Sequence, residues 1–466
     1  MSNQHYDFVA IGSGPAGQKG AIQAAKLGKR VALIERGTEV GGVAVHSGTI
    51  PSKTLREAVL YLSGWDQRGL YGQSYRLKEN LSADDLLQRI AITINYETEV
   101  MRHQLRRNGV NIIYGTGSFL DPHNIQVVSR TGEVRQLYAD NVLISTGSRP
   151  HRPEHIPFDG ETILDIDDVL NIKKIPRSMA VIGAGVIGAE YASIFGTLDM
   201  KVTLVNGRDR MLTFMDGEII DELIHHMRDQ GTIIRLGESV AQAEKDPSGG
   251  AVITLESGKR FRADLALFAS GRIGCTTALK LENAGLEADS RHRIQVNKYY
   301  QTAVPHIYAA GDVIGFPSLA STSMEQGRMA ARHALGQSTH SHPELFPFGV
   351  YAVPEMSMVG KTEEELTREK IPYEVGVARL KETARGQIMG LKEGMLKLIF
   401  SLEDNRLLGV HVIGEGATEL VHIGQAALSL GGTMDFFLET VFNYPTLAEA
   451  YKIAALDACN RLVTCR

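Results

Sequence analysis

Three glycines near the N-terminus have the spacing that binds the pyrophosphate of a dinucleotide. Gly12, Gly14 and Gly17 form a GxGxxG pattern between a short apolar run and an alanine-rich stretch. The first glycine permits a tight turn, the second lets the backbone approach the phosphates, and the third lets a helix pack closely on a strand. The next apolar run ends at Glu35, whose carboxylate can accept hydrogen bonds from both hydroxyls of an adenosine ribose. The stretch therefore predicts a strand, a helix and a second strand that bind a dinucleotide.

The same pattern recurs at Gly183, Gly185 and Gly188, but here the second strand ends in Asn206 instead of an acid. A carboxylate at this place would repel the 2′-phosphate of NADP, whereas a neutral amide can hydrogen-bond a bare ribose without that repulsion. Arg208 follows shortly after, and a guanidinium can bind a phosphate through paired N–H donors. We expect this second site to accept NADP without excluding NAD. The alternative is that the arginine is an ordinary loop residue.

Length, charge and hydropathy restrict the classes of protein that remain. The chain has 466 residues and a formal net charge of −5, which predicts about three domains and no attraction to nucleic acid. No apolar run reaches the roughly 18 residues of a membrane span, and the N-terminus does not have the pattern of a signal peptide. The histidines form no HExxH motif or ligand cluster, so no metal is predicted. We expect a cytoplasmic protein without a membrane or nucleic-acid partner.

The order of the motifs along the chain resembles a known family over nearly its whole length. It comprises the first glycine pattern, the run GGVAVHSGTIPSK at 41–53, the second glycine pattern, a Gly311–Asp312 pair and the run YPTLAE near the C-terminus. This order is similar to that of the pyridine nucleotide–disulfide oxidoreductases. The resemblance implies an α/β fold, with two Rossmann-like, doubly wound dinucleotide-binding domains and an α+β dimerisation domain. It assigns the first glycine pattern to FAD and the second to NAD(P).

Two departures from the family pattern bear on the chemistry. The two cysteines of the family's redox disulfide fall on Ala44 and Thr49, and neither side chain can take part in thiol–disulfide exchange. The family's catalytic histidine falls on Tyr444, shortly before Glu449, and a tyrosine cannot supply that base near neutral pH. The resemblance implies instead that Tyr444 packs beside the flavin of the other subunit, with a cis bond before Pro445, or that it simply packs in the interface.

The charged pair that the family places beside the flavin is retained. Lys53 corresponds to the family lysine near the flavin and Glu190 to its ion-pair partner. A positive charge there would stabilise the anionic reduced flavin, and a paired acid would limit the cost of burying that charge. Electrons could therefore enter the flavin from a nicotinamide but could not leave through a disulfide. The most economical acceptor is a second nicotinamide.

Within the family, three runs are similar to the soluble pyridine nucleotide transhydrogenases: GTIPSKTLREAV, NGRDR and FNYPTLAEAYKIAAL. This resemblance implies FAD-dependent hydride transfer between NADPH and NAD⁺, or the reverse, by a ping-pong mechanism without a redox disulfide. These relatives carry one cysteine in the frame, at the position of Ala44. Two alternatives stay open. One is an NAD(P)H diaphorase or quinone reductase of the same family, and the other is a non-catalytic FAD-binding protein.

The resemblance also implies the domains, the assembly and the site residues. The expected domains are a FAD-binding domain at 1–151 with a helical excursion near 84–108, an NAD(P)-binding domain at 152–275, a returning FAD-binding segment at 276–345 and a dimerisation domain at 346–466. Each subunit of a homo-oligomer, at least a dimer, would bind one FAD non-covalently and use NAD and NADP as substrates. The predicted catalytic residues are Lys53, Glu190, Tyr444, Glu449 and Thr49. The residues predicted to bind FAD are Gly12, Gly14, Pro15, Ala16, Gly17, Glu35, Arg36, Gly42, Thr49, Lys53, Gly117, Thr146, Gly147, Gly311, Asp312, Leu319 and Ala320. Those predicted to bind NAD(P) are Gly183, Gly185, Val186, Ile187, Gly188, Glu190, Asn206, Arg208 and Gly271.

Overall fold

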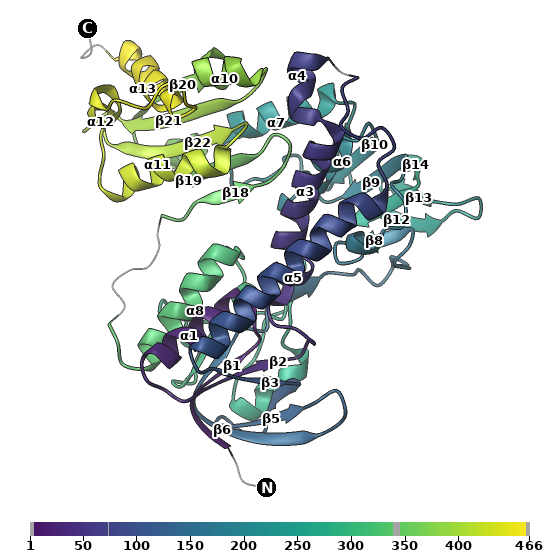
Figure 1. Cartoon of the computed structure of the whole chain (residues 1–466), viewed down its shortest axis with the longest axis vertical. Coiled ribbons are helices and arrows are strands. Elements are labelled where there is room, and N and C mark those ends of the chain that lie inside the picture. The colour runs from purple at the N-terminus through teal and green to yellow at the C-terminus, as the bar shows by residue number, and fades with distance from the viewer. Residues whose placement is uncertain (1–3, 73, 339–344, 463–466) are drawn as a thin grey trace. The chain divides into compact units, whose positions relative to one another are not determined.

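The computed structural model describes residues 4–72, 74–338 and 345–462. Its chain forms two compact units, each built from three stretches of sequence. The first unit comprises 1–55, 86–151 and 271–343, and the second comprises 56–85, 152–270 and 344–466. Figure 1 labels the helices and strands of both units. These two units are defined by compactness alone. The division into FAD-binding, NAD(P)-binding and dimerisation segments that the resemblance implies therefore stays a prediction.

A seven-stranded sheet with the order β3-β2-β1-β6-β5-β4, with β17 beside β6, organises the first unit. Strands β1, β2, β3, β6 and β17 pair in parallel, and β4 and β5 pair antiparallel at one edge. The bounds are β1 Gln4–Ile11, β2 Val31–Glu35, β3 Asn111–Tyr114, β4 Thr116–Phe119, β5 Asn124–Val128, β6 Val134–Ile144 and β17 Ile307–Ala309, with a separate pair of β7 Ser148–Pro150 and β16 Arg272–Gly274.

The parts of the central strands that lead to the glycine turn are buried on both faces and are apolar, as in Phe8–Ile11 of β1 and Val31–Ile34 of β2. Along β1, Phe8 and Ala10 belong to one core cluster, while Val9 and Ile11 belong to another on the opposite face. Helices α1 (Pro15–Lys26) and α8 (Ala320–Ala334) pack against each other in this unit. The other elements of the unit are α2 Gly42–His46 and the short turns η3 Thr277–Leu279, η4 Leu281–Ala284 and η5 Asp312–Ile314.

Two helices begin in one unit and end in the other, namely α3 (Thr49–Ser63) and α5 (Ala83–Arg107). The helical excursion expected near 84–108 is confirmed by α5.

The second unit contains another parallel sheet, with the order β11-β10-β9-β15-β8. A three-stranded antiparallel sheet accompanies it, and a five-stranded antiparallel sheet with the order β18-β19-β22-β21-β20 is formed later in the chain. The strands are β8 Ile163–Asp165, β9 Ser178–Ile182, β10 Lys201–Asn206, β11 Ile233–Leu236, β12 Val240–Lys245, β13 Ala251–Leu255, β14 Arg260–Ala263, β15 Leu265–Phe268, β18 Phe348–Val350, β19 Met356–Gly360, β20 Tyr373–Arg379, β21 Met395–Ser401 and β22 Leu407–Ile413. The expected fold class, with two dinucleotide-binding sheets and a further α+β part, is confirmed.

The second unit also contains helices and short turns. They are α4 Arg68–Tyr71, α6 Val186–Gly196, α7 Gly217–Asp229, α9 Glu363–Glu369, α10 Ala384–Met389, α11 Ala417–Ser429, α12 Met434–Glu439 and α13 Glu449–Arg461, with short turns η1 Trp65–Gln67, η2 Val169–Asn171 and η6 Leu380–Glu382. In the part of the chain that the structure describes, no helix combines the length and the apolar character that crossing a bilayer requires.

Candidate functional site

The first glycine turn has the geometry that its sequence pattern predicts. Gly12 has φ +105°, and a Cβ added there would lie 2.4 Å from the carbonyl oxygen of Ser145. A Cβ on Gly17 would lie 1.9 Å from the Gly12 carbonyl oxygen. Neither position can hold a side chain without a shift of the backbone. Helix α1 starts directly after Gly14, with no side-chain cap and no acid in its first turn, so its first N–H groups remain available to an anion.

A cleft opens in front of this turn, with an atom-free volume of about 1140 Å³ that includes open solvent. A Cβ on Gly14 or on Gly147 would meet nothing within 4 Å, so the backbone at both glycines leaves room for a ligand to approach. The cleft brings together most of the residues predicted to bind FAD, namely Gly12, Gly14, Pro15, Ala16, Glu35, Arg36, Gly42, Thr49, Gly117, Thr146, Gly147, Gly311, Asp312 and Ala320. Gly17, Lys53 and Leu319 do not line it.

Glu35, at the end of β2, is held in a fixed orientation by the protein itself. The N–H of Ser13 donates to its Oε2 at 3.1 Å, and the Ser13 hydroxyl donates to the same oxygen. The N–H of Gly37 donates to Oε1. The Ser13 hydroxyl oxygen also accepts from the N–H of Gly41 at 2.9 Å. Each carboxylate oxygen has a further lone pair, so Glu35 can still accept hydrogen bonds from a ribose.

One buried polar atom in the cleft has no partner among the described residues. The Oγ1 atom of Thr146 is inaccessible to solvent and makes no hydrogen bond within the described chain, although Thr146 lines the cleft. Leaving such a group unsatisfied costs about 1–3 kcal/mol. A polar ligand in the cleft would supply the missing partner. Together with the open space at Gly14, this atom shows that the residues present fit a bound dinucleotide such as FAD.

Sequence reasoning missed several residues of the cleft, among them Ser13, Ser148 and Cys275. The Ser148 hydroxyl donates to Oδ2 of Asp312 at 2.6 Å and accepts from Nε of Arg272 at 2.8 Å, which orients the Asp312 carboxylate. Burial raises the pKa of the Cys275 thiol. Ser13 is an unassigned position inside GxGxxG and could have been found from that motif. Ser148 and Cys275 are brought to the cleft only by the tertiary fold.

The two positions that lack the family's cysteines also line the cleft. Ala44 lies within α2, and Thr49 is the first residue of α3. Further along α3, Nζ of Lys53 donates to the Ser52 hydroxyl at 3.3 Å. Glu190, on α6 in the second unit, is 2% exposed, and its Oε1 accepts the N–H of Tyr351 at 2.9 Å. The ion pair between Lys53 and Glu190 would join the two units and stays a prediction.

The second glycine turn repeats the geometry of the first. Gly183 has φ +104°, and a Cβ there would lie 2.6 Å from the carbonyl oxygen of Ala269. A Cβ on Gly188 would lie 1.7 Å from the Gly183 carbonyl oxygen, whereas one on Gly185 would meet nothing within 4 Å. Helix α6 then begins at Val186, followed by Ile187, without a side-chain cap. The turn therefore offers the same open approach and free N–H groups to a second dinucleotide.

Asn206 ends β10, and its amide is used largely within the turn. Its Oδ1 accepts the N–H of Ala184 at 3.1 Å, while its Nδ2 donates to the carbonyl oxygens of Arg208 at 3.0 Å and Arg210 at 3.2 Å. Only the second lone pair of Oδ1 is left for a ribose hydroxyl. The side chain of Arg208 is exposed and has no ion-pair partner among the described residues. Gly271, predicted for the same site, belongs to the first unit.

The two C-terminal residues predicted to be catalytic lie before and at the start of α13. Tyr444 is 69% exposed, and the bond from it to Pro445 is cis, as expected. Glu449 is the first residue of α13, and its Oε2 is buried without a hydrogen-bond partner among the described residues. Sequence reasoning gave no indication of this unsatisfied oxygen.

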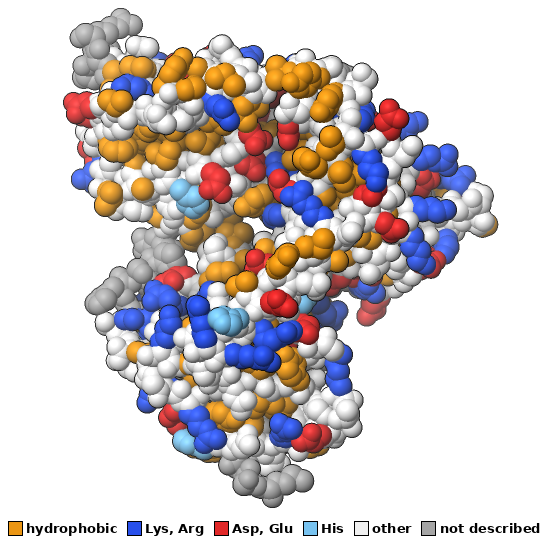
Figure 2. All heavy atoms as spheres, viewed as in Figure 1, with side chains coloured by type: hydrophobic (Ala, Val, Ile, Leu, Met, Phe, Trp, Pro, Cys, Tyr) orange, Lys and Arg blue, Asp and Glu red, His pale blue; other side chains and the backbone are white. Residues whose placement is uncertain are grey.

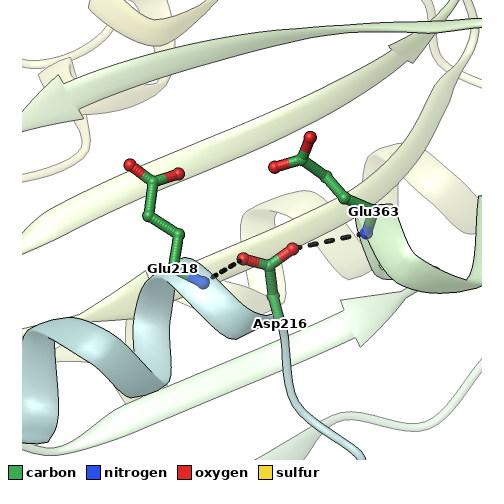
Figure 3. A group of neighbouring side chains, drawn as sticks. All are labelled: Asp216, Glu218 and Glu363. Atoms are coloured by element: carbon green, nitrogen blue, oxygen red, sulfur yellow. Dashed lines mark hydrogen bonds between the residues drawn. The ribbon is translucent and has the colours of Figure 1, made fainter. Parts of the chain in front are cut away.

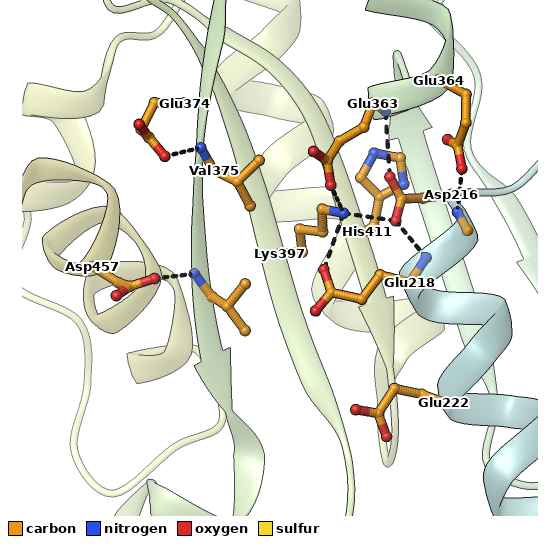
Figure 4. Close-up of polar contacts among 12 residues, drawn as sticks. Asp216, Glu218, Glu222, Glu363, Glu364, Glu374, Val375, Lys397, His411 and Asp457 are labelled. Carbon is orange, nitrogen blue, oxygen red and sulfur yellow. Dashed lines mark hydrogen bonds and ion pairs between the residues drawn. The ribbon is translucent and has the colours of Figure 1, made fainter. Parts of the chain in front are cut away.

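A separate cluster of charged side chains lies in the second unit. The carboxylates of Asp216, Glu218 and Glu363 come within reach of a common point (Figure 3). The ammonium of Lys397 fills this cluster, with its Nζ 2.8 Å from Asp216 Oδ1, 3.1 Å from Glu218 Oε2 and in contact with Glu363 (Figure 4). The lysine therefore takes the position that a metal ion would need. His411 beside it is fully buried, and burial lowers the pKa of its imidazole.

These sites match a family model over most of the chain. Residues 6–327 match the pyridine nucleotide-disulphide oxidoreductase model, and residues 346–455 match the dimerisation domain of the same family. The chain belongs to the pyridine nucleotide–disulphide oxidoreductase family, whose members are FAD-dependent oxidoreductases that act on pyridine nucleotides.

Similar sequences and solved structures indicate which members of this family the chain resembles. The chain is 54% identical over 460 residues to a soluble pyridine nucleotide transhydrogenase of Mycobacterium tuberculosis, with 98% of each chain covered. It is 46% identical over 462 residues to one of Yersinia pestis, covering 98% of this chain and 99% of the relative. Among solved structures, LpdA from Mycobacterium tuberculosis superposes with a TM-score of 0.89 at 25% identity, over 97% of this chain and 99% of that one. The flavoprotein disulfide reductase RclA from Escherichia coli gives 0.86 at 27% identity, over 97% and 99% of the two chains.

Proposed function

We propose that the chain is a FAD-dependent transhydrogenase that moves a hydride between NADPH and NAD⁺, in either direction, by a ping-pong mechanism. This proposal rests on the chemistry of residues 41–53, the segment that holds the redox disulfide in disulfide reductases of the family. Ala44 and Thr49 line the cleft where relatives of the disulfide-reductase type hold two cysteines, so this pair cannot form the disulfide that would pass electrons to a thiol substrate. The names of the curated relatives, which match 98% of this chain, support the same conclusion.

The residues of the first cleft would hold FAD. The free N–H groups at the start of α1 would bind its pyrophosphate, Glu35 would accept from its adenosine ribose, and Asp312 would accept from its ribityl chain. Thr146 Oγ1 would gain the hydrogen-bond partner that it does not have among the described residues. Bound FAD supplies a carrier that accepts an electron pair from one nicotinamide and returns it to another.

The remaining roles follow from charge and position. Lys53 would place a positive charge beside the flavin, and Glu190 would orient that lysine. Tyr444, exposed at its cis bond, would pack at the partner subunit, with Glu449 behind it. The second glycine turn would bind NAD or NADP in succession, and Asn206 and Arg208 would tolerate a 2′-phosphate. We also propose the domain segments 1–151, 152–275, 276–345 and 346–466, and a cytoplasmic location.

The test is an anaerobic assay with the purified holoenzyme, NADPH and thionicotinamide-NAD⁺. We expect reduced thionicotinamide-NAD to accumulate catalytically, with parallel double-reciprocal lines when both substrates are varied. Lipoamide and dithiol substrates should give no turnover. Reduction of the flavin without transfer to the second nucleotide, relieved by a quinone, would support a diaphorase instead. A flavin that neither nucleotide reduces would leave only a binding role.

A further inference from the structure

The first unit contains a small hollow that the proposed reaction does not use. Helices α1 and α8, the end of α5 and Asn108 line it, and it shares no lining residue with the cleft in front of the first glycine turn. Its atom-free volume is about 590 Å³, open solvent included, which is about half that of the cleft. The hollow is therefore a separate place on this unit, with room for a ligand smaller than a dinucleotide.

Four of the eight residues that line this hollow are basic. They are Lys19 and Lys26 on α1, Arg107 at the end of α5 and Arg328 on α8, and none of the described residues in the lining is an acid. Figure 2 shows Lys and Arg side chains gathered in the part of the view where Figure 1 labels α1 and α8. The chain as a whole has a formal net charge of −5, so this local excess of positive charge does not follow from its composition. A concave surface with charges of one sign attracts ions of the other sign.

The helices that carry these charges do not supply counter-ions for them. Helix α1 contains no acid over its whole length. Lys19, Lys26 and Arg107 form no ion pair and no side-chain hydrogen bond with any described residue. Arg328 is the one paired member of the four, because its Nε donates to Oε2 of Glu325 at 2.8 Å and its Nη2 contacts the same carboxylate. Its Nη1 remains available, so an anion from solution could interact with all four cations.

Side-chain amides add neutral hydrogen-bond donors to the hollow. Gln104 on α5 lines it, and the Oε1 of Gln104 accepts from Nε2 of Gln18 at 3.2 Å. Gln18 is 1% exposed, so this bond orients the Gln104 carboxamide, whose Nε2 has no acceptor among the described residues. The carboxamide of Gln23, also in the lining, makes no hydrogen bond with a described residue. An oxyanion in the hollow could accept from these N–H groups as well as from the charged ones.

The three helices hold these side chains on a common hydrophobic base. Ile22 of α1, Leu105 of α5 and Ala331 of α8 belong to one cluster of buried residues, and α1 and α8 pack directly against each other. Because such interiors are close-packed, the backbone positions of the four cations are fixed before a ligand arrives. A site arranged in advance loses less conformational freedom when it binds.

Charge and size together indicate which class of anion fits the hollow. A single carboxylate would compensate only one of the four cations. A phosphate oxyanion with two or more charges offers several acceptor oxygens, which guanidinium and ammonium groups bind well. We propose that the hollow binds a small phosphorus oxyanion of at least two charges, with diphosphate as the simplest example, either free or as part of a small phosphate ester. This site goes beyond the proposed transhydrogenation and does not depend on it.

The test is calorimetric titration of the full-length holoenzyme with diphosphate at about 0.15 M salt. We expect a dissociation constant below about 1 mM, and Lys26→Gln/Arg107→Gln should raise it at least about 10-fold. Lys298→Gln/Arg130→Gln makes the same change at two exposed positions of the first unit outside the hollow and should leave the binding unchanged. Lys26→Arg/Arg107→Lys keeps both charges and should bind more tightly than the glutamine variant. Diphosphate should also raise the thermal midpoint of the unmodified protein more than that of Lys26→Gln/Arg107→Gln.

Two further probes identify the source of the anion. Tighter binding of glycerol 3-phosphate than of diphosphate would indicate a phosphate ester as the occupant, and the reverse order a free anion; both results support the site. The absence of saturable diphosphate binding would overturn the proposal. A glutamine variant that binds diphosphate as tightly as the Lys298→Gln/Arg130→Gln control would also overturn it and would indicate that the anion binds at a glycine turn. Flotation with phosphatidylglycerol vesicles that requires Lys26 and Arg107, without diphosphate binding, would overturn it in favour of a membrane surface. None of these results involves hydride transfer, so the proposed function is judged separately.

Discussion

Replacing Lys397 by methionine should destabilise the second unit strongly, because the lysine is the buried counter-ion of three acids. Its side chain is 0% exposed and that of Asp216 is 1% exposed, with Nζ and Oδ1 2.8 Å apart. Methionine keeps much of the apolar stem but removes the charge. Removing one member of a buried ion pair typically costs about 3–5 kcal/mol, since the remaining charge is left without compensation. We expect a loss of that size at pH 7.5 in urea unfolding of the full chain.

The pH dependence of the Lys397→Met variant separates this cause from a simple packing defect. In the unmodified protein burial would raise the pKa of Asp216, but His411 and Lys397 lower it more, so it lies below its ordinary value. The stability that Asp216 contributes is then present above its unfolded pKa of about 3.9 and is lost only as the pH falls through its lower folded pKa. Lys397 lowers the pKa of both Asp216 and His411, so without it both pKa values rise and the folded site binds a proton that the unfolded chain releases. The variant should therefore become more stable as the pH falls from 8 to 5, and the unmodified protein should not.

Two comparison variants complete this experiment. Lys381→Met, the same change at an exposed position, should alter the free energy of unfolding by no more than about 0.5 kcal/mol. Lys397→Met/Asp216→Asn should recover part of the loss, because the buried negative charge is then gone. A loss below about 1 kcal/mol for Lys397→Met, or a stability that rises with pH over this range, would refute the reasoning from buried charge.

Four further predictions concern the cluster and the two nucleotide sites. In Lys397→Ala the emptied group of carboxylates should bind Mn²⁺, so the ion should raise the thermal midpoint of that variant and not of the unmodified protein; equal shifts would contradict this. Lys53→Ala should slow flavin reduction by NADPH about 10-fold or more in stopped flow, and an unchanged rate would remove its assigned role. Asn206→Glu should raise KM for NADPH at least about 10-fold more than KM for NADH, while equal changes would defeat the interpretation of that turn. Thr146→Val should weaken FAD binding up to about 10-fold without destabilising the apoprotein; a loss of apoprotein stability would mean that the hydroxyl has another partner.

The sequence predicts the nucleotide turns well because their constraints are local. Gly12 and Gly183 have φ values near +105° and lie against carbonyl oxygens of the neighbouring strand turn, and only glycine tolerates both conditions. The strand ends that lead into these turns, Phe8–Ile11 and Met179–Ile182, are buried and apolar. The resemblance implies a helical excursion near 84–108, and α5 (Ala83–Arg107) forms it.

The polar network of each site could not be predicted because it depends on contacts between distant segments. Asn206 is visible in the sequence, but nothing there shows that both of its N–H donors are used by carbonyl oxygens of its own turn. Lys397 occupies a run of apolar residues in β21, and its partner Asp216 comes from the start of α7. The same is true of Thr146, because only the fold shows that its Oγ1 is buried without a partner among the described residues.

The positions that hold the fold and the positions that set the chemistry differ in how tightly they are constrained. A Cβ at Gly12, Gly17 or Gly188 would come within 1.7–2.4 Å of a backbone oxygen, so a change at any of them disturbs the whole dinucleotide fold. Ala44 and Thr49 line the same cleft and carry ordinary side chains. A fold of this family can therefore lose its redox sulfur by changing two side chains while both nucleotide turns are kept. The architecture is shared with flavoproteins that reduce disulfides. The activity therefore has to be inferred from the side chains at positions 44 and 49 and not from the fold.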